Sequence, residues 1–132
     1  MMTPFKFSGR VIPGEKVGRS IGFPTANLDK APHESELQPG VYAGTCEIID
    51  LKIKKSLPCL IYFGPRYIFD ERRNNFEVYI YDFNKNIYDK TIAVTLLQKL
   101  RSPQKTKNLD QLQEFLEKDK QQGLKFFKNN EA

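Results

Sequence analysis

The residues best suited to chemistry lie in a glycine-rich stretch near the amino terminus. Glycine recurs there at Gly9, Gly14, Gly18 and Gly22. Backbone amides at glycine can approach phosphate oxygens closely, because no side chain blocks them. Arg19 adds a planar cationic group whose donor geometry suits phosphate oxygens. The stretch therefore indicates a binding site for a phosphorylated ligand, although a solvated surface loop could have the same composition.

This stretch does not match the common phosphate-binding motifs. Gly9 and Gly14 have the spacing of a P-loop, but Glu15 and Lys16 follow where that motif requires Lys and then Ser or Thr. The glycine spacing also departs from the Gly-x-Gly-x-x-Gly pattern of dinucleotide-binding folds and protein kinases. We therefore expect neither a P-loop domain nor a Rossmann fold.

A possible metal site follows the glycines directly. Thr25 and Asn27 carry hard oxygen ligands two residues apart, so in an extended segment both can point to the same side. Magnesium keeps several waters and takes further ligands from nucleotide phosphates, so two neutral protein oxygens suffice when a nucleotide supplies the negative charge. Pro24 rigidifies the approach to this pair. The alternative is an ordinary loop in which Thr and Asn cap local backbone groups.

Glu77 is the candidate acid or base. It lies in residues 76–81, where Phe, Val and Ile share one face of a strand while Glu77 shares the other face with two tyrosines. We expect this carboxylate to face an enclosed barrel mouth, where it could accept a proton from a substrate hydroxyl that attacks a phosphate. A surface Glu paired across the sheet with Lys or Arg is the alternative.

The elements that must position these residues are mainly strands. The amino-terminal stretch predicts a strand followed by a long loop, because its Gly and Pro residues are too frequent for a helix. Further strands are predicted at residues 41–49, 57–63, 76–81 and 91–97. Their connections are too short for crossover helices, so we expect five or six strands in antiparallel pairing.

One amphipathic helix is predicted at the carboxyl end. Asn108 is a good N-cap and Gln111 can complete a capping box. Leucine and phenylalanine side chains then recur at helical spacing, and Gly123 is expected to end the helix. We expect the apolar stripe to pack against the outside of the strands.

Composition narrows the function classes. The 132 residues are 39% hydrophobic and 28% charged, which predicts a single domain over residues 1–132. Cys46 and Cys59 are isolated in apolar stretches, which indicates buried thiols and no zinc site. His33, the sole histidine, lies between Pro32 and Glu34 in a polar stretch, so we expect neither a serine-hydrolase triad nor a two-histidine metal site. The chain has neither an apolar run of membrane-spanning length nor a signal peptide, so we expect a cytoplasmic protein.

The net charge of +5 favours anionic partners, whether nucleotides, nucleic acids or anionic membranes. A longer motif chooses among them. Residues 18–27 read Gly-Arg-x-x-Gly-x-Pro-Thr-Ala-Asn, which resembles the ATP-binding signature of the riboflavin kinase (flavokinase) family. Further segments resemble the same family: residues 39–43 its strand entry, 76–83 its catalytic-glutamate strand, 100–101 its flavin-side Leu-Arg, and 109–119 its closing helix.

This resemblance implies a mainly β fold: a closed six-stranded antiparallel Greek-key barrel with a C-terminal α-helix. It also implies an ATP-dependent riboflavin 5′-phosphotransferase that uses Mg2+ and makes FMN and ADP. Its partners would be the small molecules riboflavin and ATP, without nucleic acid or membrane, and the protein would be a monomer. The implied site residues are the catalytic base Glu77, the flavin contact Arg101, the metal ligands Thr25 and Asn27, and the nucleotide contacts Gly14, Arg19, Thr25 and Asn27.

The chain departs from the family pattern mainly on the flavin side. Residues 64–69 read Gly-Pro-Arg-Tyr-Ile-Phe where the family has Gly-x-x-Pro-Thr-Phe, and residues 101–104 read Arg-Ser-Pro-Gln where it has Arg-Pro-Glu. Asp89 replaces a glycine. These departures leave an alternative open, a non-catalytic flavin- or nucleotide-binding module on the same barrel. The basic charge alone would also fit a nucleic-acid-binding barrel, which would leave the Pro-Thr-Ala-Asn motif and Glu77 unexplained.

Overall fold

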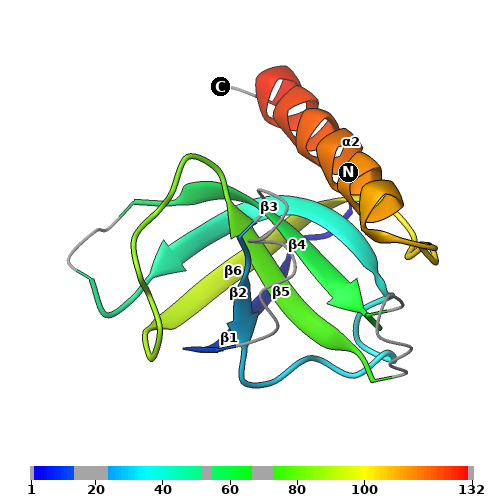
Figure 1. Ribbon diagram of the computed structural model, residues 1–132. Helices are drawn as coiled ribbons and strands as arrows, with labels where there is room; N and C mark the ends of the chain where they lie inside the picture. The colour runs from blue at the N-terminus through cyan, green and yellow to red at the C-terminus, as the bar shows by residue number, and fades with distance from the viewer. Residues whose placement is uncertain (1, 14–23, 52–54, 67–72, 131–132) are drawn as a thin grey trace.

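The strands form a closed antiparallel barrel. The structure is a computed structural model that describes residues 2–13, 24–51, 55–66 and 73–130. Within these residues the strands are β1 (Phe5–Ile12), β2 (Ala26–Leu28), β3 (Gly40–Ile48), β4 (Leu57–Gly64), β5 (Asn75–Ile80) and β6 (Thr91–Arg101). They pair in the order β1-β2-β5-β4-β3-β6, and β6 pairs with β1 to close the barrel (Figure 1). The neighbours β6, β3, β4 and β5 form a Greek key, so the predicted fold class is confirmed.

Strand β2 completes the closure although it has only three residues. Val11 and Ile12 at the end of β1 pair with one of its sides, while Glu77 and Val78 of β5 pair with the other. The sequence predicted an extended segment here but not a strand. An alternation of apolar and polar residues cannot identify a strand of three residues, and all three residues of β2 are buried.

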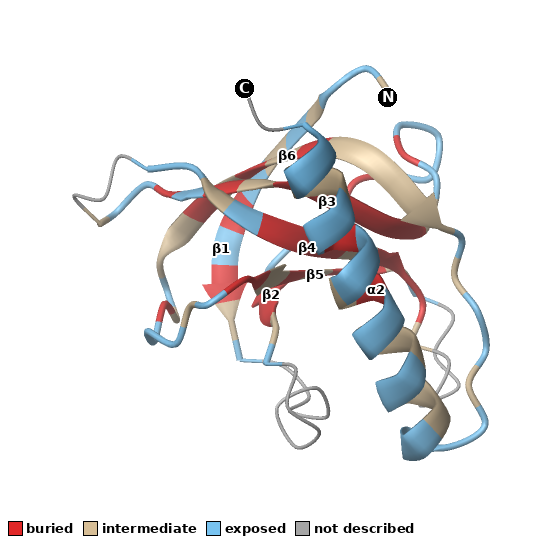
Figure 2. Cartoon of the chain, turned by 90° about the horizontal axis from the view of Figure 1, so that it is seen from above, coloured by how far each residue is buried: buried red, intermediate tan, exposed pale blue. Residues whose placement is uncertain are grey.

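Alternation along the strands divides the barrel into a core and an outer face. On β5, Phe76, Val78 and Ile80 are buried in the core, as the sequence predicted, while Glu77 and Tyr79 are only partly buried. Strands β3, β4 and β5 are largely buried, whereas the connections between strands are largely exposed (Figure 2). Aromatic rings fill part of the core, where Phe76 packs against Phe7 with ring centroids 4.9 Å apart.

Strand register aligns one row of residues across five strands. Asn27 pairs with Glu77, Glu77 with Tyr62, Tyr62 with Val41, and Val41 with Arg101. Directly paired residues point to the same face of a sheet, and each step across the sheet spans about 5 Å. Because the flanking residues of β5 enter the core, this row lies on the outer face. From the sequence we expect Glu77 to face an enclosed barrel mouth. In the structure it lies on the outer face of the sheet instead.

The carboxyl-terminal helix α2 (Leu109–Asn129) packs outside the barrel against β3, β4 and β6 (Figure 1). It begins as predicted, since the Asn108 side chain accepts a hydrogen bond from the Gln111 backbone N–H. The predicted end at Gly123 is wrong, because the helix continues through that glycine. Gly123 is buried against the barrel, where a Cβ would lie 2.7 Å from Leu60 Cδ2 and still closer to the Tyr81 hydroxyl. The glycine thus permits close approach.

Tyr81 anchors the second half of the helix to the barrel. Its hydroxyl donates to the backbone carbonyl of Lys120 at 2.9 Å, and its ring meets Phe127 edge-on at a centroid distance of 6.0 Å. Burial raises the pKa of Tyr81, so its hydroxyl remains a donor at neutral pH. Among the described residues, no helix has the length and apolar character that crossing a membrane requires.

Cys46 on β3 and Cys59 on β4 are free thiols buried in the core, as the sequence predicted. Burial, with a contribution from nearby Glu47, raises the pKa of Cys46 to about 12, and burial also raises the pKa of Cys59. Both thiols therefore stay protonated across the physiological range, which makes them poor nucleophiles.

We predict that replacing Gly123 with Ala destabilises the protein by about 1–3 kcal/mol, because the new methyl group overlaps Tyr81 and Leu60. Urea unfolding followed by circular dichroism measures the change. The exposed neighbour Gln122→Ala is the control and should be neutral or slightly stabilising. Equal stabilities for the two variants would show that the helix does not need the glycine.

We also predict that iodoacetamide at pH 8 leaves both cysteines unmodified in the folded protein and labels both in urea. Burial excludes the reagent and raises both thiol pKa values, so the folded protein offers little thiolate. The pKa of Cys46 is higher in the folded protein than in the unfolded chain, where it is near 9. The free energy of unfolding therefore keeps its full value with respect to this thiol below pH 9 and decreases as the pH rises toward 12. Mass spectrometry counts the labels, and rapid labelling without urea would contradict the buried placement.

Candidate active site

The structure brings the predicted metal ligand Thr25 and the predicted base Glu77 together, although 52 positions separate them in sequence. The Thr25 hydroxyl donates to Glu77 Oε1 at 3.3 Å. Antiparallel pairing of β2 with β5 causes this, since Asn27 lies directly opposite Glu77 in the register. Three of the predicted site residues therefore meet at the pairing of these two strands.

Asn27 is held by a cation that the sequence had not assigned to the site. Only 7% of Asn27 is exposed, and its side-chain oxygen Oδ1 accepts a hydrogen bond from Arg66 Nη2 at 3.2 Å. The same Arg66 nitrogen donates to Asn75 Oδ1 at 3.1 Å. Arg66 follows β4 and Asn75 begins β5, so the contacts join three parts of the barrel.

A pocket of about 520 Å³ opens beside this group of side chains. Among the described residues that line it, three are cationic, Lys30, Arg66 and Arg73, and one is a carboxylate, Asp29. Asp29 is also engaged elsewhere, since its Oδ1 accepts from the backbone N–H of Arg10 at 3.0 Å. The pocket is therefore electropositive and suits a polyanionic ligand. Its remaining lining residues are Ile12, Pro13, Asn27, Leu28, Ala31, Asn74, Asn75 and Phe76.

The donor atoms near Glu77 fit a magnesium ion that is bound together with a nucleotide. Within the described residues no group of three or more His, Cys, Asp or Glu side chains could hold a metal by itself. Thr25 Oγ1 and Asn27 Oδ1 are hard oxygens, and the amide oxygen has two lone pairs, of which Arg66 uses one. Both oxygens are uncharged, so a phosphate-bearing ligand would have to supply the negative charge and the remaining ligands.

Arg101, the predicted flavin contact, is bound to the helix. Its Nε and Nη2 donate to the two carboxylate oxygens of Asp119 at 2.7 and 2.8 Å, and its guanidinium lies 5.3 Å from the centre of the Phe115 ring. Asp119 is buried and Arg101 is partly buried, so this is a fork-like ion pair largely shielded from water. It ties the end of β6 to α2. The remaining terminal nitrogen, Nη1, donates to the Ser102 carbonyl at 3.2 Å.

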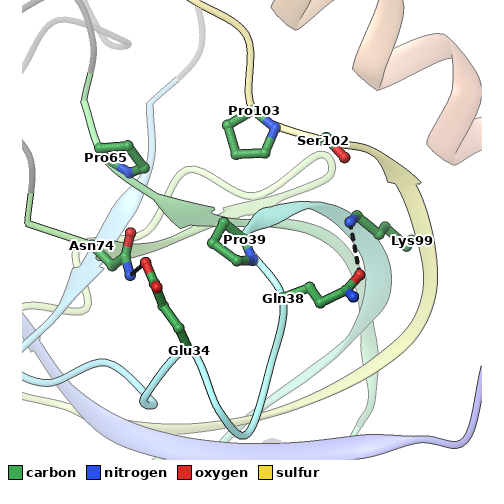
Figure 3. A pocket seen from close by; sticks show the side chains of 8 residues that line it. All are labelled: Glu34, Gln38, Pro39, Pro65, Asn74, Lys99, Ser102 and Pro103. Atoms are coloured by element: carbon green, nitrogen blue, oxygen red, sulfur yellow. Dashed lines mark hydrogen bonds between the residues drawn. The ribbon is translucent and has the colours of Figure 1, made fainter.

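A second pocket, of about 450 Å³, lies near the end of β6 (Figure 3). Pro39, Pro65 and Pro103 form parts of its wall, and Gln38 accepts a hydrogen bond from Lys99 at 3.2 Å. Its other lining residues are Glu34, Asn74 and Ser102. Both segments that depart from the family pattern contribute to this pocket, through a proline of each.

Tyr62 lies between the second pocket and Glu77. It pairs with Glu77 in the register of β4 and β5, and its hydroxyl donates to the Pro65 carbonyl. Gly64 makes room for this arrangement, since a Cβ there would lie 3.0 Å from the Tyr62 hydroxyl and 3.3 Å from Pro103. The outer row thus leads from Asn27 through Glu77 and Tyr62 toward the wall of the second pocket.

Two predicted nucleotide contacts, Gly14 and Arg19, lie outside the described residues. Reasoning from sequence missed Arg66, Asn75 and Lys30. Arg66 could have been noticed as a cation within a segment that resembles a family motif, but nothing in the sequence indicated that it would contact Asn27, which lies 39 positions earlier.

The comparisons with known proteins agree with this architecture. The model of the family described as "Flavokinase: Riboflavin kinase" matches residues 1–127. The chain is 36% identical over 126 residues to the bifunctional riboflavin kinase/FMN adenylyltransferase of Escherichia coli strain K12, covering 94% of this chain and 38% of the relative. It is 35% identical over 130 residues to the protein of the same description from Bacillus subtilis strain 168, covering 96% and 40%.

Solved structures resemble the whole chain. A riboflavin kinase from Trypanosoma brucei superimposes with a TM-score of 0.63 at 21% identity, covering 98% of this chain and 83% of that one, which shows a shared fold. A Streptococcus pneumoniae structure described as a macrolide-efflux protein gives a TM-score of 0.72 at 31% identity, with coverage of 98% and 40%. The chain therefore belongs to the flavokinase (riboflavin kinase) family. It spans about two fifths of the length of the two curated relatives above.

We predict that Asp119→Ala lowers the free energy of unfolding by about 2 kcal/mol, because the Arg101 guanidinium then loses its partner in a partly buried site. Urea unfolding measures the loss. Glu117→Ala is the control, since Glu117 is an exposed acidic residue on the same helix and should change stability by less than about 0.5 kcal/mol. Equal losses would mean that the ion pair does not anchor α2.

Proposed function

We propose that this protein transfers the γ-phosphoryl group of ATP to the 5′-hydroxyl of riboflavin, producing FMN and ADP. The observation that carries the proposal is the 3.3 Å contact between Thr25 Oγ1 and Glu77 Oε1, beside an electropositive pocket. A carboxylate, a hard oxygen ligand and a pocket suited to a polyanion thus lie next to one another, and phosphoryl transfer needs all three. Membership of the riboflavin kinase family and the names of the relatives support the choice of riboflavin as acceptor.

In this proposal Glu77 acts as the general base. Its carboxylate accepts the proton of the riboflavin 5′-hydroxyl as that oxygen forms a bond to the γ-phosphorus. The bond between the γ-phosphorus and the bridging oxygen breaks, and its electron pair leaves with ADP. Thr25 donates to one oxygen of the same carboxylate and so orients Glu77.

The electropositive pocket is the proposed nucleotide site. Lys30, Arg66 and Arg73 would offset the charge of the phosphates, and Pro13 places the end of β1 at the rim. Thr25 and Asn27 are the proposed ligands of Mg2+, which when bound would neutralise phosphate charge as it shifts during transfer. Gly14 and Arg19 remain proposed nucleotide contacts on the basis of the family signature.

The second pocket is the proposed flavin side of the site. It lies beyond Tyr62 along the outer row from Glu77, and its wall includes Ser102 and Pro103 next to Arg101. Arg101 remains the proposed flavin-side residue. Its ion pair with Asp119 and its bond to the Ser102 carbonyl would shape the wall from behind.

A non-catalytic flavin- or nucleotide-binding module is the second candidate. The specific observation in its favour is that Pro65 and Pro103, from the two segments that depart from the family pattern, line the same pocket. If these changes alter how the acceptor hydroxyl is placed, the barrel would bind ligands without transferring phosphate. Such a module would raise its melting temperature with riboflavin or ATP yet release no ADP.

We predict that the unaltered protein makes FMN from riboflavin, ATP and Mg2+, and that Glu77→Gln lowers kcat by about 100-fold to 10,000-fold. The amide keeps the shape of the side chain but cannot accept the proton. Chromatography of the flavins measures the product, and calorimetry with a non-hydrolysable ATP analogue should show unchanged nucleotide affinity. The exposed Glu114→Gln is the control and should keep full activity.

Full activity of Glu77→Gln would reject Glu77 as the base. No FMN from the unaltered protein under any divalent metal, together with thermal stabilisation by riboflavin or ATP, would instead favour the binding module.

A further inference from the structure

A chain of hydrogen bonds ends on the oxygen of Asn27. The Asn75 amide nitrogen Nδ2 donates to the backbone carbonyl of Arg73 at 3.2 Å, which leaves Asn75 Oδ1 facing Arg66. Arg66 Nη2 donates to that oxygen at 3.1 Å and to Asn27 Oδ1 at 3.2 Å. The Arg73 carbonyl thus sets which end of the Asn75 amide faces Arg66, and Arg66 sets which end of the Asn27 amide faces it.

This direction matters at Asn27 because the two ends of an amide are not equivalent. Its oxygen can bind a cation, whereas its NH2 group can only donate. Asn27 and Asn75 are 7% and 9% exposed, so water has little access to reorient them. A cationic donor is a strong means of holding an amide oxygen, since charge-assisted hydrogen bonds are roughly twice as strong as neutral ones.

We propose that Arg66 is a positioning residue that fixes the Asn27 side chain with its oxygen available to the metal and nucleotide. Arg66 acts through Asn27, and Asn75 holds Arg66 in place. The inference rests on the proposed function insofar as Asn27 serves a metal-bound nucleotide. It adds a residue that the family motif does not specify, since in residues 64–69 only the glycine and the last phenylalanine match that motif.

A different role for Arg66 has to be distinguished from this one. Arg66 also lines the electropositive pocket with Lys30 and Arg73, so it could act simply as one positive charge near the phosphates. A charge of that kind would attract the nucleotide with or without Mg2+ and would not depend on Asn27. A positioning role affects the metal-dependent part of binding and requires the Asn27 side chain.

The test is a double-mutant cycle measured by calorimetry with AMPPNP, a non-hydrolysable ATP analogue, with and without Mg2+. We expect Arg66→Met to weaken binding of the Mg2+ complex by about tenfold or more, as is usual when the support of a metal ligand is removed. The loss without Mg2+ should be no greater than that of the control Arg73→Met, which removes one charge from the same pocket. In an Asn27→Ala background, Arg66→Met should add no further metal-dependent loss.

Two further variants guard against an unfolded protein. Arg66→Lys keeps the charge and one donor and should restore part of the affinity for the Mg2+ complex. Asn75→Ala leaves Arg66 in the chain but removes the acceptor that holds it, and should produce a smaller loss of the same metal-dependent kind. Thermal melts show that each variant is folded at the temperature of the titration.

The inference is overturned if Arg66→Met and Arg73→Met weaken binding equally in both conditions, or if the effect of Arg66→Met persists without the Asn27 side chain. It is also overturned if the unaltered protein binds AMPPNP no better with Mg2+ than without. Failure of the proposed function would look different, because these titrations require no phosphoryl transfer: the protein would show the Arg66 and Asn27 coupling but form no FMN.

Discussion

The pairing of β2 with β5 is the contact on which both the barrel and its candidate site depend. Only three residues of β2 lie between β1 and β5, and without them the sheet would have two open edges at this point. The same register sets Asn27 opposite Glu77 and brings Thr25 within hydrogen-bond reach of the carboxylate. A shift of one residue would turn Asn27 into the core, so closing the barrel and assembling the site impose the same requirement.

A second constraint follows from the packed core. Aromatic and branched side chains fill the interior, so a ligand as large as a nucleotide has to bind outside the strands. One pocket lies beside Asn27 and the other near Tyr62, so the two proposed substrates could meet near Glu77, which lies between these residues in the outer row. The helix α2 bounds that row, because the ion pair between Arg101 and Asp119 holds it at the end of β6.

The strands, the start of the helix and part of the candidate site could be predicted from the sequence. Each feature that could not be predicted has a physical reason. The strands were found because alternation and β-branched residues are local signals, and the helix start because Asn108 caps its own neighbours. The helix end was misplaced because the conformational preference of Gly123 is overridden by packing against the barrel. Thr25, Asn27 and Glu77 were predicted from a motif, whereas Arg66 contacts Asn27 from a segment distant in sequence, and such contacts cannot be read from a single sequence.

The two sides of the candidate site also differ in what holds their residues. On the metal side, Asn27 and Glu77 belong to paired strands, so their positions are fixed by backbone hydrogen bonds and by the core behind them. On the other side, Pro65 and Pro103 lie just beyond strand ends, where fewer contacts determine the backbone. Changes of sequence in such segments alter a pocket without disturbing the barrel. Pro65 and Pro103 belong to two of the segments that depart from the family pattern, and because they lie beyond the strand ends, these changes can coexist with the contact between Thr25 and Glu77 and the pairing of Asn27 with Glu77.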